Sequence, residues 1–408
     1  MTLQVEIPDS LARQVTDLAV QQSVTVANYM KGRILVTFFL GLYSIVWSLI
    51  IAVPVAVWQA YKRDSTIDRA GNVLASLESH PDSPLVALTA HLDTVLAPRT
   101  KDDVTIDSDG DMLGPGVSDN GTGLAALLAI AKAIKSTPQP ADIWNRLLLI
   151  ANVGEEGEGN LAGMRHICGQ PELIQSIAAF LVLDGAAIDH ITTQALGSRR
   201  FEVTFTGNGG HSWSDFGTGN PVHALNRALS FFIDQNPLDP RATPKVSVNI
   251  GLIEGGSSIN SIPASARAKI DIRSESNDKM DRLVAALQAS VTRSEEIENQ
   301  RCLGPKVVSR VREIGSRPAA RLAPDAAILP IIRSVDAHLG IRSRLECAST
   351  DANIPLSLGI PAVSIGAGGK GGGAHTAAEW YRPDGRDLGL KRVLLSAALL
   401  LEDCGRTV

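Results

Sequence analysis

Short apolar runs alternate with longer helical stretches along most of the chain. Residues 85–90, 147–151, 180–183 and 361–365 are mainly apolar and show no regular alternation with polar residues. Runs of this length are typical of strands that are buried on both faces of a sheet. The stretch 124–134 is rich in Ala and Leu and predicts a helix. This rhythm indicates a mainly parallel sheet covered by helices.

The pattern changes in the middle of the chain. Apolar and polar residues alternate strictly at 201–206 and again at 266–273. Such alternation describes strands with one face on a core and the other in water. Helical stretches near 221–233 and 278–294 lie between and after these strands. The sequence therefore predicts an α/β domain interrupted by a smaller α+β insert.

An apolar segment near the N-terminus stands apart from this pattern. Residues 34–61 contain no Asp, Glu, Lys or Arg. At about 1.5 Å per residue a helix of this length could cross a hydrocarbon core of about 30 Å. We expect a membrane anchor on an otherwise cytoplasmic protein; the alternative is a helix buried in the globular part. Basic residues flank both ends equally, so the orientation stays open.

The residues ahead of this segment, 1–33, are expected to form an N-terminal extension. Their strand-then-helix pattern weakly resembles a ribbon-helix-helix module, but few of them are basic, and nucleic acid is not an expected partner. The predicted organisation has five segments. They are the extension at 1–33, the apolar helix at 34–61, the first part of the α/β domain at 62–196, the insert at 197–314 and the second part of the α/β domain at 315–408.

Composition narrows the classes of partner and metal site. The 408 residues include 38 Lys and Arg against 43 Asp and Glu, a formal net charge of -5, so there is no basic excess for binding nucleic acid. The four cysteines are scattered without a C-x-x-C pair, which argues against a disulfide framework and a thiolate zinc site. Any metal would have to be held by His and carboxylate groups.

Polar residues follow the predicted buried strands, where open α/β sheets place their sites. His91 and Asp93 lie two positions apart in extended chain, so their side chains point to the same side. Asp93 could hold one imidazole nitrogen while the other faces a metal. Asp119 follows in a glycine-rich segment just before the predicted helix. Its alternative role is that of a helix N-cap.

Two adjacent carboxylates, Glu155 and Glu156, follow another buried strand. Next to apolar surroundings they would not both ionise readily without a compensating charge. A divalent cation supplies that charge. One Glu could bind the cation while its neighbour takes a proton from the bound water. The alternative is a solvated acidic turn. Two histidines and three carboxylates, each after a buried strand or in a glycine-rich loop, together form an oxygen and nitrogen ligand set suited to zinc or a similar ion. The set is His91, Asp119, one of Glu155 and Glu156, Asp184 and His375.

From about Asp68 to the C-terminus the chain resembles the co-catalytic metallopeptidase family of aminoacylase, peptidase T, acetylornithine deacetylase and succinyl-diaminopimelate desuccinylase. The order and spacing of its motifs match through both domains. The matching strings are AHLDTV at 90–95, SDNG at 118–121, EE at 155–156, LDG at 183–185, GHS at 210–212, GGSSINSIP at 255–263, DIR at 271–273, STDAN at 349–353 and HT at 375–376 followed by Glu379.

The resemblance implies a zinc-exopeptidase-like catalytic domain that binds two divalent metal ions. Zinc is expected, with Co²⁺ or Mn²⁺ as alternatives. His91, Asp119 and Asp184 would hold one ion. Asp119, Glu156 and His375 would hold the second, so that Asp119 bridges the pair.

The same resemblance assigns roles to residues around the ions. Asp93 would orient the first histidine ligand, and Glu155 would act as general base and then acid. In the insert, a ferredoxin-like lid and dimerisation domain, His211 would stabilise the developing oxyanion, often across a homodimer. Asn260 and Arg273 would bind the carboxylate or backbone of the substrate.

The sequence thus predicts a hydrolase that cleaves amide bonds with a metal-bridged hydroxide. The motifs at 349–353 and 375–376 are nearest to the peptidase T branch, so small peptides are the first choice of substrate. N-acyl amino acids are the alternative within the family, and a non-catalytic, membrane-tethered binding protein is the alternative outside it. The family normally has two soluble helices where this chain has its apolar segment.

Overall fold

The structure is a computed structural model that describes most of the chain beyond the N-terminal segments. The expected extension at 1–33 and apolar helix at 34–61 lie outside the described residues. Among the described residues, none of the helices combines the length and the hydropathy that a membrane span requires. The described residues are 65–68, 70–76, 84–96, 103–137 and 142–406.

The chain divides into two compact units. The first combines Met1–Gln194 with Arg321–Val408, and the second is the continuous segment Ala195–Ala320. The insert was expected at 197–314. The second unit reaches further at its C-terminal end because its last strand pairs with its first strand as far as Arg317.

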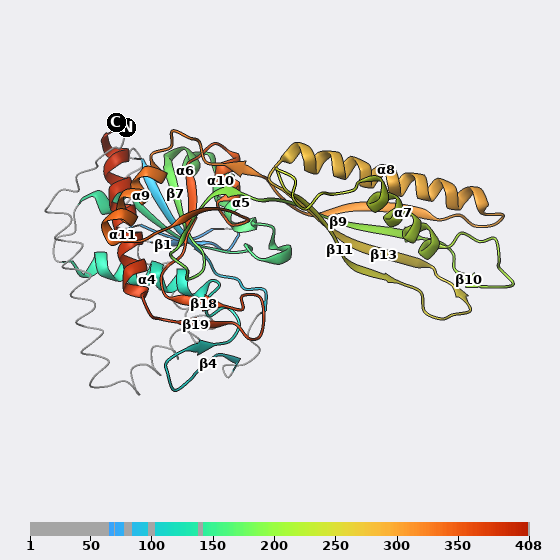
Figure 1. The fold of residues 1–408 in the computed structure, drawn as a ribbon, viewed down its shortest axis with the longest axis horizontal. Coiled ribbons are helices and arrows are strands. Elements are labelled where there is room, and N and C mark those ends of the chain that lie inside the picture. The colour runs from blue at the N-terminus through green and yellow to red at the C-terminus, as the bar shows by residue number, and fades with distance from the viewer. Residues whose placement is uncertain (1–64, 69, 77–83, 97–102, 138–141, 407–408) are drawn as a thin grey trace. The chain divides into compact units, whose positions relative to one another are not determined.

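The first unit is built on one large mixed sheet with helices packed on both faces (Figure 1). The strands, in spatial order, are β1 (Ser65–Ile67), β2 (Val73–Ala75), β6 (Leu147–Asn152), β3 (Leu85–His91), β7 (Ile177–Leu183), β17 (Ala362–Ile365), β8 (His190–Ala195) and β15 (Ala320–Arg321), with β16 (Arg344–Ala348) paired to β8. The central strands β6, β3, β7 and β17 run parallel to one another. The mainly parallel sheet predicted from the apolar runs is confirmed.

The helices of this unit form two groups. α11 packs against both α4 and α9, while α5 packs against both α6 and α10. Strand β7 lies in the middle of the sheet, and nearly all of its side chains are buried. The helices are α4 (Gly121–Ser136), α5 (Ala162–Cys168), α6 (Pro171–Ser176), α9 (Ile328–Leu339), α10 (Asn353–Ser357) and α11 (Arg386–Arg406), with short 3-10 turns at Asp142–Arg146 and Gly157–Gly159.

A small antiparallel sheet in the same unit joins two distant parts of the chain. Its order is β18 (Lys370–Gly372), β19 (Trp380–Arg382), β5 (Met112–Leu113) and β4 (Thr105–Ile106). Trp380 of β19 pairs with Leu113 of β5. The segment that follows β5 and the loop between β18 and β19 are therefore held beside each other.

The second unit is an antiparallel sheet with two helices packed against it. Its strands follow the order β11 (Val246–Gly255), β13 (Ser265–Ser274), β9 (Gly197–Thr206) and β14 (Val308–Arg317), and its helices are α7 (Pro221–Gln235) and α8 (Asn277–Arg301). Phe201, Val203 and Phe205 of β9 are buried in its core, as their alternation predicted. A short pair, β10 (Gly210–His211) and β12 (Ser261–Ile262), completes the unit.

Candidate metal centre

The candidate ligands gather at one edge of the large sheet. β3 ends at His91, β6 ends just before Glu155, and β7 ends just before Asp184. Because these three strands are parallel neighbours, their carboxyl ends meet at the same edge. Asp119 reaches this edge from the start of α4, and His375 reaches it from the loop between β18 and β19.

His91 presents one ring nitrogen to a group of carboxylates. The side chain is only 2% exposed, and its Nδ1 lies 2.9 Å from the backbone oxygen of Asp93. A proton on Nδ1 makes this a hydrogen bond and leaves the lone pair of Nε2 free. Nε2 lies 3.1 Å from Oδ1 of Asp119 and 4.0 Å from Oδ1 of Asp184. The imidazole is thus oriented as a metal ligand would be.

Asp93 orients this histidine differently from the expectation. Its carboxylate was expected to hold the ring, but Oδ1 is 3.9 Å from Nδ1, and the backbone oxygen makes the contact instead. The carboxylate accepts hydrogen bonds from the backbone N–H of Glu155 at 3.1 Å and of Glu156 at 2.8 Å. Because β3 and β6 are neighbours, Asp93 can reach the turn that follows β6. It therefore positions both glutamates.

Asp119 is free to act as a bridge because its neighbour caps the helix. The side chain of Asn120 accepts the N–H of Gly123 at the start of α4, so Asp119 is not the N-cap. The two oxygens of Asp119 face different imidazoles. Oδ1 lies 3.1 Å from Nε2 of His91, and Oδ2 lies 3.1 Å from Nε2 of His375.

The described residues form two overlapping groups that could each hold a metal ion. One contains His91, Asp119 and Asp184, and the other contains Asp119, Glu156 and His375. Within each group the ligand atoms lie within 4.8 Å of one another. These are the two sets implied by the resemblance, and they share Asp119. A third group joins His91 to both glutamates of the 155–156 pair.

The electrostatics of the site call for added positive charge. Burial raises the pKa of Asp184 well above its usual range. Burial, and then the charges of Asp119 and Glu155, raise the pKa of Glu156 to about 7. Burial alone would lower the pKa of His91, but the surrounding carboxylates raise it well above 6.5. So many buried carboxylates cannot all ionise unless cations compensate them, and the nitrogen and oxygen donors suit zinc or similar divalent ions.

Glu155 belongs to the third of these groups, and its charge acts on a buried carboxyl group for which the sequence predicted no role. Glu155 is 5% exposed. Asp351 is fully buried, and burial followed by the charge of Glu155 raises its pKa to about 7. Its Oδ2 accepts a hydrogen bond of 2.7 Å from Asn152 at the end of β6. The sequence shows the motif at 349–353 but not the role of its aspartate, because the burial of Asp351 depends on tertiary packing.

Two of the three predicted substrate residues lie together in the second unit. His211 pairs in β10 with Ser261 of β12, next to Asn260. Nδ1 of His211 accepts the backbone N–H of Trp213 at 3.2 Å and of Ser214 at 3.4 Å. A ring nitrogen that accepts a hydrogen bond carries no proton, so in the neutral ring the proton is on Nε2. His211 can therefore donate a hydrogen bond without being charged.

Arg273 is not near that pair within the unit. It lies near the far end of β13, about 26 Å from Ser265 at the rise of an extended strand. Its Nε donates to Oδ2 of Asp271 at 2.6 Å. The alternation at 266–273 already predicted a strand that carries Arg273 away from Asn260, whereas the resemblance grouped the two residues by role alone.

Two protein-family models match parts of this chain. A model described as "Peptidase family M28" matches residues 72–211, and one described as "Peptidase dimerisation domain" matches residues 194–296. A "Peptidase M20 domain-containing protein" from Sordaria macrospora is 30% identical over 221 residues, which cover 50% of this chain and 47% of that protein. The matched part of the chain covers about half the length of this relative and of a "Probable carboxypeptidase" from Uncinocarpus reesii.

Solved structures share the fold over most of the chain. A tripeptidase from Staphylococcus aureus has a TM-score of 0.68 at 21% identity and covers 86% of this chain and 92% of its own. The aminopeptidase PepT from Bacillus cereus has a TM-score of 0.63 at 18% identity, with 82% and 89% covered. At these identities the likeness concerns the fold.

Proposed function

We propose, because this chain belongs to the co-catalytic metallopeptidases of the M20 and M28 families, that it is a metal-dependent exopeptidase that hydrolyses short peptides. The observation that carries the proposal is the sharing of Asp119 between two ligand groups. A carboxylate with one oxygen toward each of two imidazoles is what a pair of neighbouring cations requires.

Two divalent cations, zinc in the first instance, would be held by the two groups. His91 and Asp184 complete the first site, and Glu156 and His375 complete the second. When bound, the cations supply positive charge that polarises the amide carbonyl and lowers the pKa of the attacking water.

Glu155 is the general base of the proposed reaction. Its backbone N–H is held by the carboxylate of Asp93, and its side chain is buried beside the ligand groups. It would take the proton of the attacking water and pass it to the leaving amine. Burial keeps bulk water from competing for that proton.

His211 is the proposed donor to the oxyanion. Backbone N–H groups occupy its Nδ1, so Nε2–H remains to donate to a developing negative charge. Asn260 would bind the substrate from the same end of the unit, and Arg273 would bind it from the opposite end. Since one small substrate cannot span that strand, we propose that the partner subunit of a homodimer supplies one of these groups.

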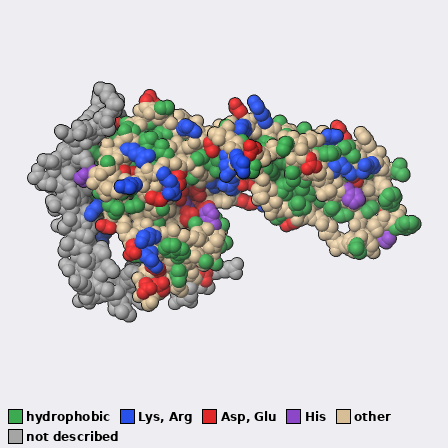
Figure 2. Space-filling model, in the orientation of Figure 1, with side chains coloured by type: hydrophobic (Ala, Val, Ile, Leu, Met, Phe, Trp, Pro, Cys, Tyr) green, Lys and Arg blue, Asp and Glu red, His purple; other side chains and the backbone are tan. Residues whose placement is uncertain are grey.

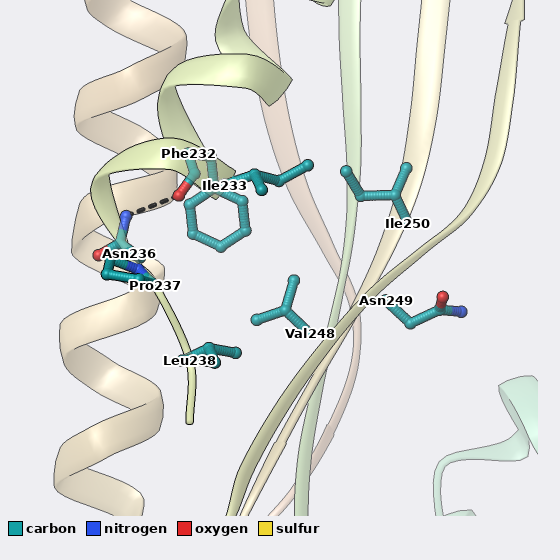
Figure 3. Close-up of a pocket in the computed structure, with 8 residues that line it drawn as sticks. All are labelled: Phe232, Ile233, Asn236, Pro237, Leu238, Val248, Asn249 and Ile250. Atoms are coloured by element: carbon teal, nitrogen blue, oxygen red, sulfur yellow. Dashed lines mark hydrogen bonds between the residues drawn. The ribbon is translucent and has the colours of Figure 1, made fainter. Parts of the chain in front are cut away.

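The edge strand β11 is the proposed dimer contact. Val248 and Ile250 on this strand line a pocket of about 330 Å³ together with Phe232, Ile233 and Leu238 (Figure 3). Ile253 on the same strand is 64% exposed. An unpaired strand edge beside an apolar groove is suited to pairing with a second copy of the chain.

Replacing Ile253 with Glu should convert the dimer to a monomer, because the new charge would be buried in the contact. Light scattering coupled to size-exclusion chromatography measures the change. Val308→Glu is the matched control, since Val308 is an equally exposed residue at 63% on β14, the opposite edge strand. A dimer that survives Ile253→Glu and dissociates with Val308→Glu would move the contact to β14.

A substrate panel tests the proposed reaction. The zinc-loaded full-length protein should hydrolyse a tripeptide with a kcat/KM about tenfold or more above that for N-acetyl amino acids. Dipeptides and peptides with blocked N- or C-termini in the same panel show which end is recognised. Turnover of the acetylated compounds alone would replace the peptidase with an N-acyl-amino-acid deacylase. If the zinc-loaded protein hydrolyses no member, the chain is a binding protein.

A further inference from the structure

Glu379 is a buried carboxylate whose partners are backbone N–H groups. The side chain is 1% exposed. Its Oε2 accepts the N–H of Gly116 at 2.8 Å, and its Oε1 accepts the N–H groups of Ser118 and Asp119, each at 2.8 Å. Hydrogen bonds to an ionised acceptor are about twice as strong as neutral ones. The segment 114–119, which carries Asp119, is therefore folded around this carboxylate.

The shape of that segment depends on glycine. Gly114 has φ +134° and Gly116 has φ +78°, which are conformations that residues with a side chain rarely adopt. They turn the N–H groups of the segment inward, as in the backbone nests that bind anions. Here the anion belongs to the chain itself, and it comes from a position 260 residues from Asp119.

The backbone of Glu379 makes a second connection. Its oxygen accepts the N–H of Gly114 at 2.8 Å, and its N–H donates to the oxygen of Thr376 at 3.3 Å. The hydroxyl of Thr376 in turn donates to the oxygen of Gly373 at 2.7 Å. The turn from Gly373 to Glu379, which contains His375, is thus closed on the same residue that binds the segment of Asp119.

We propose, on the basis of the proposed function, that Glu379 is a positioning residue for the second cation site. It ties the segment of Asp119 to the turn of His375, and so sets the 3.1 Å approach of Oδ2 to Nε2. The first site depends less on it, because that site takes only Asp119 from these two parts of the chain, whereas the second site takes both Asp119 and His375. His91 ends β3 and Asp184 directly follows β7, and both strands lie within the large sheet.

The substitution Glu379→Gln tests this role, because it keeps the size of the side chain and replaces one acceptor oxygen with an NH₂ donor. The NH₂ group would face backbone N–H groups, and it cannot accept hydrogen bonds from them. Two cations per chain should become one tightly held and one weakly held cation, with the second Kd raised about 10–100-fold. Zinc binding to the full-length protein by titration calorimetry measures both affinities. Excess zinc should restore part of the lost activity.

Asp111→Asn is the matched control. Asp111 is buried next to the same small sheet, and its Oδ1 accepts Nε of Arg382 in β19 at 2.8 Å. This variant should lower thermal stability and leave both zinc affinities unchanged. If Glu379→Gln does the same, Glu379 is merely structural and the inference is overturned.

If the Gln variant does not fold, zinc binding is measured on Glu379→Asp instead. It keeps the charge but shortens the reach, so the second cation should again be the weaker one; wild-type affinities for both cations would overturn the inference. Zinc binding is read without substrate. A wild type that binds two cations and hydrolyses nothing would therefore contradict the proposed function alone.

Discussion

Asp119→Ala should remove both cation sites at once and lower kcat/KM by roughly 10³-fold or more. Each oxygen of Asp119 faces a different imidazole at 3.1 Å, so both sites lose a ligand when the carboxylate is removed. The remaining pairs, His91 with Asp184 and Glu156 with His375, offer only two ligands to each of the two proposed cations, and the third group would need Glu155 as a ligand instead of as the base. Elemental analysis after dialysis should find far fewer than two zinc ions per chain.

Glu156→Ala separates this bridging role from a general loss of negative charge. It removes one carboxylate from the second group and leaves the first group complete. One zinc ion per chain should remain, in contrast to the loss of both with Asp119→Ala. Equal zinc content in the two variants would show that Asp119 does not bridge.

Glu155→Gln should lower kcat by about 10²–10⁴-fold while the zinc content stays near that of the wild type. The amide cannot accept a proton from water, but it preserves the size of the side chain. The contact that fixes this residue also survives, because Asp93 binds its backbone N–H and not its carboxylate. Steady-state kinetics on the peptide and elemental analysis of the same sample measure the two quantities.

Glu158→Gln is the control for this second prediction. Glu158 is an exposed carboxylate in the same acidic stretch, and it belongs to none of the ligand groups. Its kcat should remain within about twofold of the wild type. If Glu155→Gln instead loses zinc in step with activity, Glu155 acts as a ligand and another group must be the base.

Much of the fold could be predicted because burial leaves a strong pattern in the sequence. β3 and β7 are covered on both faces, so nearly every position in them is apolar. β9 and β13 are covered on one face, so their residues alternate. The candidate ligands were found for a related reason. His91, Glu156 and Asp184 are polar residues at or just after the ends of such apolar runs, where the chain reaches the edge of the sheet.

The hydrogen-bond partners within the site could not be predicted in the same way. Whether Asp93 binds the ring of His91 or the backbone of the following turn depends on how β3 and β6 align. Whether Asp119 or Asn120 caps α4 depends on a difference of one residue in the turn. The role of Glu379 depends on a contact between parts of the chain 260 residues apart. None of these choices leaves a periodic signal.

The arrangement of the substrate residues could be predicted only in part, although the alternation at 266–273 already indicates the strand that separates two of them. Asn260 and Arg273 are close in sequence, but β13 separates them along nearly its whole length. Residues that are far apart within one strand are also far apart in space, whereas residues on the two sides of a turn can lie close together. The motifs therefore identified these residues without showing that they lie at opposite ends of one unit.

Anomalous diffraction from crystals of the zinc-loaded protein, collected at the zinc edge, tests the metal centre directly. Two peaks should appear about 3.5–4 Å apart on either side of Asp119, one beside His91 and Asp184 and the other beside Glu156 and His375. A single peak, or peaks away from these five side chains, would contradict the two-cation site.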